Sequence, residues 1–426
     1  MKTKPKISAY TLGCKLNFAE TSSIVRQFLD NGYELVPYGQ KADVTILNTC
    51  TVTAQADKKT RKSIHKAAKL ADHVIVLGCS AQLHIDEYSK IEGVDLVLGV
   101  KDKFRAYELF EKQQRGAYSC ESNLVESFDH AFSTAGRTRS FLKVQDGCDY
   151  KCSYCIIPKA RGKSRNAPVS EIIDDAKKIA AEGYKEIILT GVNIGHFGKS
   201  TGETFLDLLK ALDREVDVPR IRISSVEPEL LSEDIIRLVA GSGKFLPHFH
   251  IPLQSGSDEI LRLMRRRYNT KLFASRLELI KKIIPDAFIG VDVIVGFPGE
   301  TDSLFEQTYE FLTAMPFTYL HIFPYSDRPG TPASMMDAKV DYNTKIEREK
   351  RLRSLSDQKH EQFYKDNLGK EYNVLFETKT KEGNLTGFTD NYIRVQANIP
   401  ADFVNTIHKV RLQSISGNGI VQARVL

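Results

Sequence analysis

Three cysteines near the middle of the chain have a spacing that suits a metal cluster. They stand in the segment GCDYKCSYC as Cys148, Cys152 and Cys155. Thiolates so close in sequence can hold a cube-shaped 4Fe-4S cluster, but three thiolates leave one of its irons without a protein ligand. An open coordination position of this kind could bind the amino and carboxylate groups of S-adenosylmethionine. Reductive cleavage of that molecule would give a 5′-deoxyadenosyl radical, and the protein would only direct this chemistry of the cofactor.

A zinc site or a chance grouping of core cysteines accounts for the triplet less well. A structural zinc ion normally takes four protein ligands, and the nearest candidate for the fourth, His196, lies far downstream. Three unrelated core cysteines would not account for the position of the triplet, directly after a strand-like segment that opens a β/α region. Tyr154 also places an aromatic ring beside the last cysteine. These features favour the cluster with an open iron.

Four more cysteines precede the triplet. Cys14, Cys50 and Cys79 each come directly after a short apolar run, whereas Cys120 follows a charged helical segment and is interpreted as a free thiol. The chain starts without an apolar signal segment, and no run approaches about 18 apolar residues, so we expect a cytoplasmic protein with no membrane contact. Thiols stay reduced in that compartment, which argues against disulfides. The first three cysteines are therefore either metal ligands or ordinary buried core residues.

The elements that must position these cysteines follow from hydrophobic periodicity. Residues 6–13, 43–49 and 73–78 are expected strands, and amphipathic helices separate them. This pattern predicts an α/β domain with a doubly wound parallel sheet, whose ligands bind at the carboxyl ends of the strands. Cys14, Cys50 and Cys79 would then converge at one edge of the sheet.

Two further regions follow. From residue 134 the β/α rhythm resumes with six strand candidates, which predicts a partial (βα)6 relative of the TIM barrel with its chemistry at the carboxyl mouth. Residues 338–360 are expected to form a charged helical connector, and the last part alternates short apolar and polar segments, as in a small antiparallel β-barrel. We therefore expect three domains, at residues 1–133, 134–360 and 361–426.

The motifs and the three-domain layout resemble the methylthiotransferases, radical S-adenosylmethionine enzymes with an added N-terminal cluster domain and a C-terminal TRAM domain. The similar segments are TLGCKLN, NTCTVT, LGCSAQ, the cysteine triplet, LQSGS, GFPGET and RPGTPA. The resemblance implies two 4Fe-4S clusters and S-adenosylmethionine as both methyl donor and radical source. It also implies that Cys14, Cys50 and Cys79 hold an auxiliary cluster that carries the transferred sulfur, so all six cysteines are expected to be catalytic.

Polar residues at the ends of the barrel strands are candidates for cofactor and substrate contacts. By resemblance these are Tyr154, Thr190, Gly191, Val192, Asn193, Ser225, Glu227, Gln254, Ser255, Asp292 and Phe323. Glycine after a strand permits close approach of backbone to a ligand. For any single Ser or Asp, a helix cap or a core hydrogen bond accounts for the residue nearly as well.

Clusters of cations suggest contact with RNA. The chain has 60 Lys and Arg against 54 Asp and Glu, a mild excess that permits a polyanionic partner. Solvated helix faces are the ordinary alternative for such runs. The last domain, residues 361–426, contains eight Lys or Arg and seven Asp or Glu, so it is not strongly basic. The candidates are Lys58, Lys59, Arg61, Lys62, Arg265, Arg266, Arg267, Arg328, Lys379 and Arg394.

The segment around the first cysteine suggests a branch of the family. GCKLN resembles the GCKVN of the branch acting on N6-threonylcarbamoyladenosine, while the isopentenyladenosine branch favours GCQMN and the ribosomal-protein branch GCPKN. The implied reaction gives the 2-methylthio derivative of that nucleoside next to the anticodon. The implied partners are a transfer RNA anticodon stem-loop, an electron donor such as a flavodoxin or ferredoxin, and a sulfur source. A catalytically silent iron-sulfur protein that binds RNA or acts as a sensor is the alternative from another class.

Overall fold

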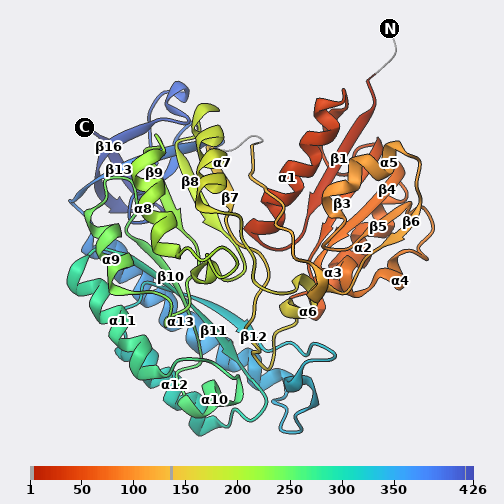
Figure 1. Ribbon diagram of the computed structural model, residues 1–426. Helices are drawn as coiled ribbons and strands as arrows, with labels where there is room; N and C mark the ends of the chain where they lie inside the picture. The colour runs from red at the N-terminus through yellow and green to blue at the C-terminus, as the bar shows by residue number, and fades with distance from the viewer. Residues whose placement is uncertain (1–3, 135–137, 418) are drawn as a thin grey trace.

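A computed structural model describes residues 4–134, 138–417 and 419–426 (Figure 1). The chain forms a parallel sheet with helices on both faces, then a partial β/α barrel, and last a small closed β-barrel. In the described part of the chain, no helix combines the length and apolarity that crossing a bilayer requires.

The N-terminal sheet is entirely parallel, and its strand order is β2-β1-β3-β4-β5-β6. The strands are β1 (Lys6–Thr11), β2 (Glu34–Val36), β3 (Ala42–Thr49), β4 (Ala71–Gly78), β5 (Leu96–Leu98) and β6 (Gly116–Tyr118). The helices are α1 (Lys15–Asp30), α2 (Ala54–Ala67), α3 (Cys79–Leu83), α4 (Ile85–Tyr88) and α5 (Ala106–Glu111). Phe28 of α1 packs on one face of the sheet and Ile64 of α2 on the other. The predicted doubly wound sheet is confirmed.

The central domain contains six strands in two three-stranded parallel sheets. They are β7 (Arg139–Lys143), β8 (Glu186–Thr190) and β9 (Arg220–Ile223), then β10 (His248–Gln254), β11 (Phe288–Val295) and β12 (Tyr319–Pro324). A parallel bridge between Ser225 and His250 joins the two sheets into one curved wall. An apolar core between the strands and the outer helices holds this wall, as predicted for a partial barrel.

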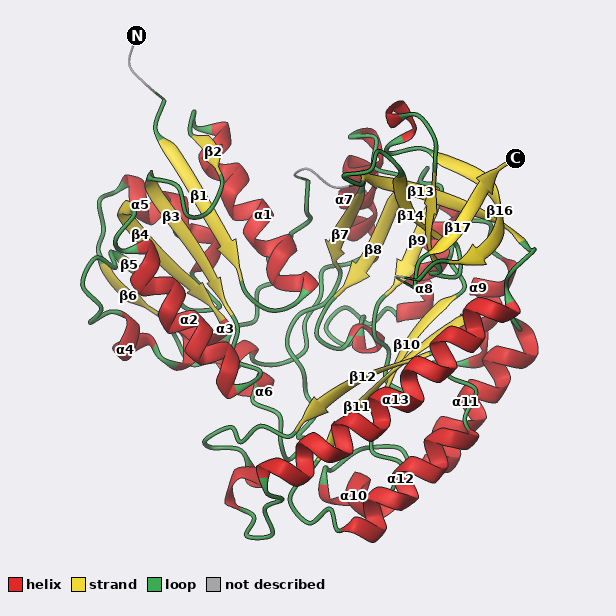
Figure 2. Cartoon of the chain, turned by 180° about the vertical axis from the view of Figure 1, so that it is seen from behind, coloured by secondary structure: helices red, strands yellow, loops and turns green. Residues whose placement is uncertain are grey.

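Helices follow the strands along the outside of the barrel. They are α6 (Ile157–Arg161), α7 (Val169–Ala181), α8 (Phe205–Glu215), α9 (Glu233–Gly241), α10 (Asp258–Leu263), α11 (Thr270–Ile283), α12 (Asp302–Ala314) and α13 (Tyr342–Asp366). The expected charged connector is α13, which runs across the last strands (Figure 2). It continues six residues past the proposed boundary at residue 360, because Phe363 and Tyr364 pack into the core of the next domain.

The C-terminal domain is a closed barrel with strand order β13-β14-β15-β17-β16. Its strands are β13 (Glu371–Lys379), β14 (Leu385–Thr389), β15 (Arg394–Ala397), β16 (Ile407–Ile415) and β17 (Val421–Val425). All pairs are antiparallel except β15 with β17. The guanidinium of Arg220 donates to the carbonyls of Phe388 and Thr389, which fixes this domain to the amino-terminal end of the central strands.

The N-terminal domain lies against the open edge of the partial barrel. Helix α1 packs on β7, where Phe18 meets Phe141 edge to face at 5.7 Å. Residues before β7 also pair with it, through an antiparallel bridge between Phe132 and Leu142. Figure 2 shows α1 beside β7, and α6 close to α3. Helix α1 and the α3–α6 contact therefore hold the N-terminal domain against the central domain.

Candidate cluster-binding centre

Three cysteines meet at the carboxyl edge of the N-terminal sheet. Cys14 follows β1, Cys50 follows β3, and Cys79 begins α3 directly after β4. These strands are neighbours, and the chain reverses its direction of winding between β1 and β3, which is where open parallel sheets bind ligands. The turns need glycine: a Cβ on Gly13 would lie 3.0 Å from the Cys50 sulfur, and the φ of Gly13 is 101°. The predicted convergence is confirmed.

The three thiols form a set that requires a cation. Burial, and then the neighbouring Cys79 and Cys14, raise the pKa of Cys50 to about 12. Burial also raises the pKa of Cys79. Thiols in this environment become thiolates only when a positive group replaces their protons, which is how metal binding is coupled to deprotonation. The donor set and its environment fit a cluster held by three thiolates.

A buried ion-pair network connects this cysteine set to the central domain. Arg161, at the end of α6, donates Nε to the Cys79 sulfur at 3.1 Å. Its Nη1 donates to Glu20 at 3.0 Å and to Asp146 at 2.8 Å, and all three side chains are at most 2% exposed. Burial raises the pKa of Glu20, but Arg161 and two lysines outweigh burial and lower it to about 2. Glu20 is therefore an anion that compensates the buried guanidinium.

The second cysteine set lies in the loop after β7. Ser153 fixes this loop to the end of α10, with its amide donating to the Met264 carbonyl at 3.0 Å. Burial and Cys152 raise the pKa of Cys155 to about 12, so this set also needs a cation to form thiolates. Arg266 donates Nη1 to the Cys152 sulfur at 3.1 Å and its Nη2 pairs with Glu227. Burial raises the pKa of Glu227 to about 7 despite this pair.

The turn after β8 is fitted closely to the cysteine loop. The Gln145 side-chain oxygen accepts hydrogen bonds from the amides of Val192 at 3.0 Å and Asn193 at 2.8 Å. A Cβ on Gly191 would lie 2.8 Å from the Gln145 carbonyl, so only glycine fits there. The side-chain oxygen of buried Asn193 accepts no hydrogen bond from any described residue. Asn193 thus keeps an unpaired oxygen beside Cys148, as expected for a residue that contacts a cofactor.

A cavity of about 220 Å³ lies between the two cysteine-bearing domains. Val52 and Thr53 of the N-terminal domain form one wall. Four of the predicted cofactor residues line the other, namely Tyr154, Gln254, Asp292 and Phe323. The structure therefore brings these four residues together at the carboxyl mouth of the barrel.

Two predicted contact residues have structural partners instead. The hydroxyl of Ser255 is buried and lies 3.2 Å from the Thr308 hydroxyl of α12, so it stabilises a helix contact and does not face the cavity. Ser225 makes the bridge to His250 through its backbone. Thr190 ends β8 and is buried.

The predicted RNA contacts separate into exposed and buried groups. Lys58, Lys59, Lys62, Arg265, Arg267, Lys379 and Arg394 are exposed, and Arg61 pairs with Glu87 at 2.5 Å. The prediction is wrong for Arg266 and Arg328 as surface cations. The side chain of Arg266 is 3% exposed because it faces the Cys152 sulfur. The side chain of Arg328 is 6% exposed because it pairs with Asp57 at 2.6 Å.

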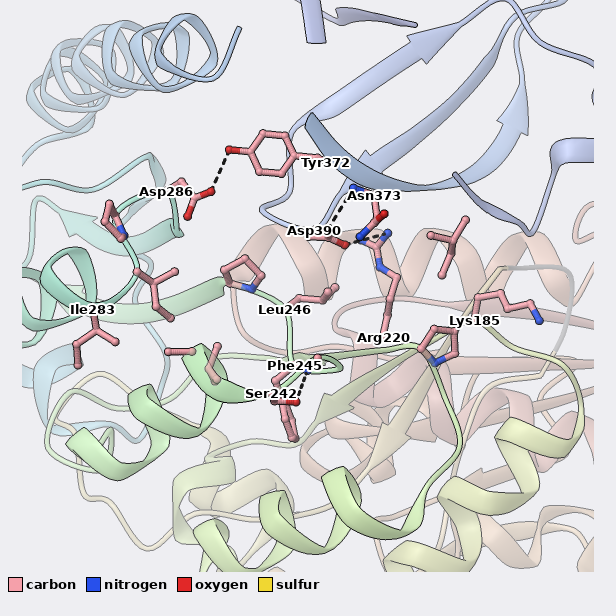
Figure 3. Close-up of a pocket in the computed structure, with 18 of the residues that line it drawn as sticks. Lys185, Arg220, Ser242, Phe245, Leu246, Ile283, Asp286, Tyr372, Asn373 and Asp390 are labelled. Atoms are coloured by element: carbon pink, nitrogen blue, oxygen red, sulfur yellow. Dashed lines mark hydrogen bonds and ion pairs between the residues drawn. The ribbon is translucent and has the colours of Figure 1, made fainter. Parts of the chain in front are cut away.

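A larger cavity, of about 990 Å³, lies far from the cysteines (Figure 3). It opens between the amino-terminal ends of the central strands, marked by Lys185 and Arg220, and the C-terminal barrel, marked by Tyr372 and Asp390. Barrel enzymes of this type place their chemistry at the other end of the strands. This cavity is therefore a junction between domains.

Sequence reasoning missed the buried charges of the site. Arg161, Glu20 and Asn17 were not candidates, although the Asn17 side-chain oxygen accepts a hydrogen bond from Arg161 at 2.5 Å. Asn17 could have been identified from the sequence, because its spacing from Cys14 places it one helical turn later. Arg161 stands in a segment rich in surface-type cations, and composition does not distinguish a buried arginine from an exposed one.

Comparisons with known proteins agree with this geometry. Residues 142–312 match the Radical SAM superfamily, and residues 6–99 match the uncharacterized protein family UPF0004. The chain is 41% identical over 430 residues to the threonylcarbamoyladenosine tRNA methylthiotransferase MtaB of Bacillus subtilis, covering 95% of this chain and 93% of that protein. The MtaB of Aquifex aeolicus is 38% identical, with coverage of 92% and 96%. The tRNA-2-methylthio-N(6)-dimethylallyladenosine synthase of Bacillus pumilus is 32% identical, with coverage of 94% and 82%.

A solved structure shares the fold. The radical S-adenosylmethionine methyltransferase TsrM of Kitasatospora setae has a TM-score of 0.57 at 14% identity, covering 78% of this chain and 74% of that one. A partial barrel whose first strand leads into a three-cysteine loop defines a radical S-adenosylmethionine protein. With a second cysteine set on an N-terminal sheet, and with its full-length relatives, the chain belongs to the radical S-adenosylmethionine methylthiotransferase family. Its cofactors are S-adenosylmethionine and two 4Fe-4S clusters.

Proposed function

We propose that this enzyme converts N6-threonylcarbamoyladenosine next to the anticodon of transfer RNA into its 2-methylthio derivative. The observation that carries the proposal is the identity of 41% over nearly the whole chain to a protein of that name. The site supports it, because the cavity between the two domains is lined by Val52, two residues after Cys50, and by Tyr154, which adjoins Cys155. Such an enzyme needs an electron donor, for which a flavodoxin or ferredoxin is suitable, and a source of sulfur. We expect it to act in the cytoplasm.

The residues divide the work between the two domains. Cys148, Cys152 and Cys155 would hold the cluster that binds and reduces S-adenosylmethionine, and Cys14, Cys50 and Cys79 the cluster that supplies sulfur. Asn193, beside Cys148, and Glu227, paired with Arg266, would bind the cofactor. Val52 and Phe323 line the cavity with apolar side chains that are 56% and 48% exposed, and bound transfer RNA would cover them and exclude water from the reacting carbon.

Exposed cations would guide the transfer RNA onto the cavity. Lys58, Lys59 and Lys62 lie on α2, whose first turn adjoins the cavity through Thr53. Lys379 and Arg394 extend the positive surface onto the C-terminal barrel. Contacts with phosphates of this kind give affinity without sequence specificity.

Nucleoside mass spectrometry of transfer RNA tests the proposal. RNA from cells with and without the gene should differ in one nucleoside, which gains the mass of one sulfur plus one CH2 only when the gene is present. The reconstituted enzyme should produce the same change in a stem-loop carrying threonylcarbamoyladenosine. Modification of an isopentenyladenosine stem-loop or of a ribosomal protein instead would replace the proposed substrate. Absence of 5′-deoxyadenosine after reduction would contradict enzymatic activity altogether.

A further inference from the structure

Lys15 is the first residue of α1, the helix that packs on β7 of the central barrel. The charged groups that act on it most strongly are Arg222 and Arg139, followed by Glu186, and all three belong to the first strands of the barrel. It also acts electrostatically on His248 of β10 and His321 of β12. Lys15 is accessible to solvent and has no hydrogen bond or ion pair with another described residue. Lys15 is therefore a cation without a partner among the described residues, next to the charged groups of the first barrel strands.

Arg222 presents two unused donors in the same place. Its side chain is 1% exposed, and its Nε pairs with Glu186 at 2.9 Å while its guanidinium lies 4.5 Å above the Tyr392 ring. Neither Nη1 nor Nη2 has a hydrogen-bond partner among the described residues. Buried donors of a charged group are costly to leave unpaired. The two Nη groups form the fork that binds a carboxylate through two parallel hydrogen bonds.

The charge around these two residues is not balanced. Four cations meet here, namely Lys15, Arg139, Arg220 and Arg222. Three carboxylates face them: Glu186 is shared by Arg220 and Arg222, Glu377 pairs with Arg139 at 2.5 Å, and Asp390 lies 3.9 Å from Arg220. Cys14, whose thiolate also acts on Lys15, is an expected cluster ligand. Among the charged side chains that do not bind the cluster, one positive charge remains, so this region is suited to one additional anion.

The position of this surplus charge fits the proposed substrate. Asp292 lines the cavity at the mouth of the barrel, and its carboxylate is 2.7 Å from His250. His248 lies two residues earlier on β10, and its ring is 4.7 Å from the Tyr392 ring, over which Arg222 lies. A row of polar side chains therefore runs from the mouth, past His250 and His248, to Arg222. An adenine held at the mouth would direct a substituent on its N6 atom along this row.

We propose that Lys15 and Arg222 bind the carboxylate of the threonyl group of the substrate nucleoside. The inference rests on the proposed function and names the part of the site that distinguishes its substrate. A threonylcarbamoyl group ends in a carboxylate and carries a ureido group that can hydrogen-bond to His250 and Asp292. A dimethylallyl group is an uncharged hydrocarbon, and it would leave the two cations unpaired.

A neutralised substrate tests this inference. The reconstituted enzyme is given two anticodon stem-loops, one with threonylcarbamoyladenosine and one with its threonyl methyl ester, and dissociation constants and kcat/KM are measured for both. We expect the wild type to prefer the acid by about 10- to 100-fold, as hydrogen bonds to charged groups imply. In Lys15→Gln this preference should fall by about tenfold, and Lys15→Arg should restore it. Lys350→Gln, an exposed lysine of α13, should keep the wild-type preference.

Three outcomes would overturn the inference, and they are distinguishable. If the wild type converts acid and ester equally well, the carboxylate is not recognised, although the proposed function stands. If Lys15→Gln keeps its iron and the wild-type preference for the acid, Lys15 does not bind the carboxylate. If the wild type converts neither stem-loop, the proposed function fails together with the inference. The comparison of acid and ester in the wild type remains decisive even if Lys15→Gln loses the auxiliary cluster.

Discussion

Arg161 and Arg266 occupy equivalent roles in the two cysteine sets. Each places a nitrogen 3.1 Å from one cysteine sulfur, and each is paired with a glutamate, Glu20 or Glu227. Hydrogen bonds to the sulfur ligands are among the factors that set the reduction potential of a cluster. A guanidinium also stabilises the thiolate form of its cysteine. The two sites therefore share one electrostatic design although they lie on unrelated folds.

Separate removal of the two cysteine sets should produce different defects. Replacing Cys148, Cys152 and Cys155 with Ala should abolish formation of 5′-deoxyadenosine, because the site that binds and reduces S-adenosylmethionine is lost. Replacing Cys14, Cys50 and Cys79 should preserve that product and stop sulfur insertion. Iron should fall from about eight to about four per chain in either variant. Iron analysis and product chromatography measure these effects, and identical phenotypes would contradict two separate roles.

At the scale of single residues, the sequence predicted the cluster-binding cysteines but not the buried charged side chains around them. The cysteines could be found because their spacing and their positions after strands carry a specific signal. Arg266 was interpreted as a surface cation because it stands in a run of arginines with Arg265 and Arg267. In the structure these two neighbours are exposed, whereas the Arg266 side chain is buried. Which arginine turns inward depends on the packing of Ser153 against the end of α10, a contact between distant segments.

At the scale of elements, the segment before β7 connects the first two domains and is held in place by His130. His130 lies between two acids of α7, with Nδ1 2.6 Å from Asp175 and Nε2 3.0 Å from Glu171. The hydrogen bond to Asp175, followed by the charge of that carboxylate, raises the pKa of His130 above its ordinary value despite burial. The pair fixes the connection between the first two domains onto the outside of the barrel.

This pair should make stability depend on pH. Because the pKa is higher in the folded state, the protonated His130 stabilises the fold below about pH 6.5, and the effect is lost as the pH rises through the folded pKa. The histidine side chain is 36% exposed, so the contribution should be below about 1 kcal/mol. Urea unfolding of iron-free protein on both sides of this range measures it. His130→Gln should weaken the dependence, and an unchanged pH profile would contradict the assignment.

The elements themselves were largely predictable, and the exceptions have physical reasons. Periodicity indicated the long strands β1, β3 and β4, but β2, β5 and β6 have three residues each and are too short to show alternation. The parallel pairing of β15 with β17 also could not be predicted, because closure of a small barrel is decided by contacts distant in sequence. The C-terminal end of α13 is fixed by packing on the last domain.

At the scale of the whole molecule, two buried arginines close the N-terminal domain onto the barrel. Arg161 reaches Glu20 from one side, and Arg328 reaches Asp57 and Thr51, each at 2.6 Å, from the other. The amide of Ala54 also donates to the Ser326 hydroxyl at 3.1 Å. Thr51 adjoins Cys50, so the second contact fixes the auxiliary thiols relative to the cavity.

Loss of this second contact should uncouple the two sites. Arg328→Ala leaves Asp57 as a buried charge without its partner, which costs about 3–5 kcal/mol. We expect sulfur insertion to fall by at least about tenfold, because a misplacement of about 1 Å has effects of this size, while 5′-deoxyadenosine is still formed. Arg351→Ala is the matched control, since Arg351 and its partner Glu306 are both about 40% exposed or more. Equal losses in both variants would show that the contact has no specific role.

The hydrogen bond from Arg161 to Cys79 also bears on the order in which the protein is assembled. Arg161 lies 82 residues after Cys79, so a growing chain on the ribosome completes the N-terminal sheet well before this guanidinium emerges. Until then Glu20 is paired with Lys103 of its own domain, at 2.6 Å, and Cys79 lacks the hydrogen bond from Arg161. Iron delivered to the nascent sheet would find an incomplete cluster site. The auxiliary cluster site can therefore be completed only after the second domain has been synthesised and has docked.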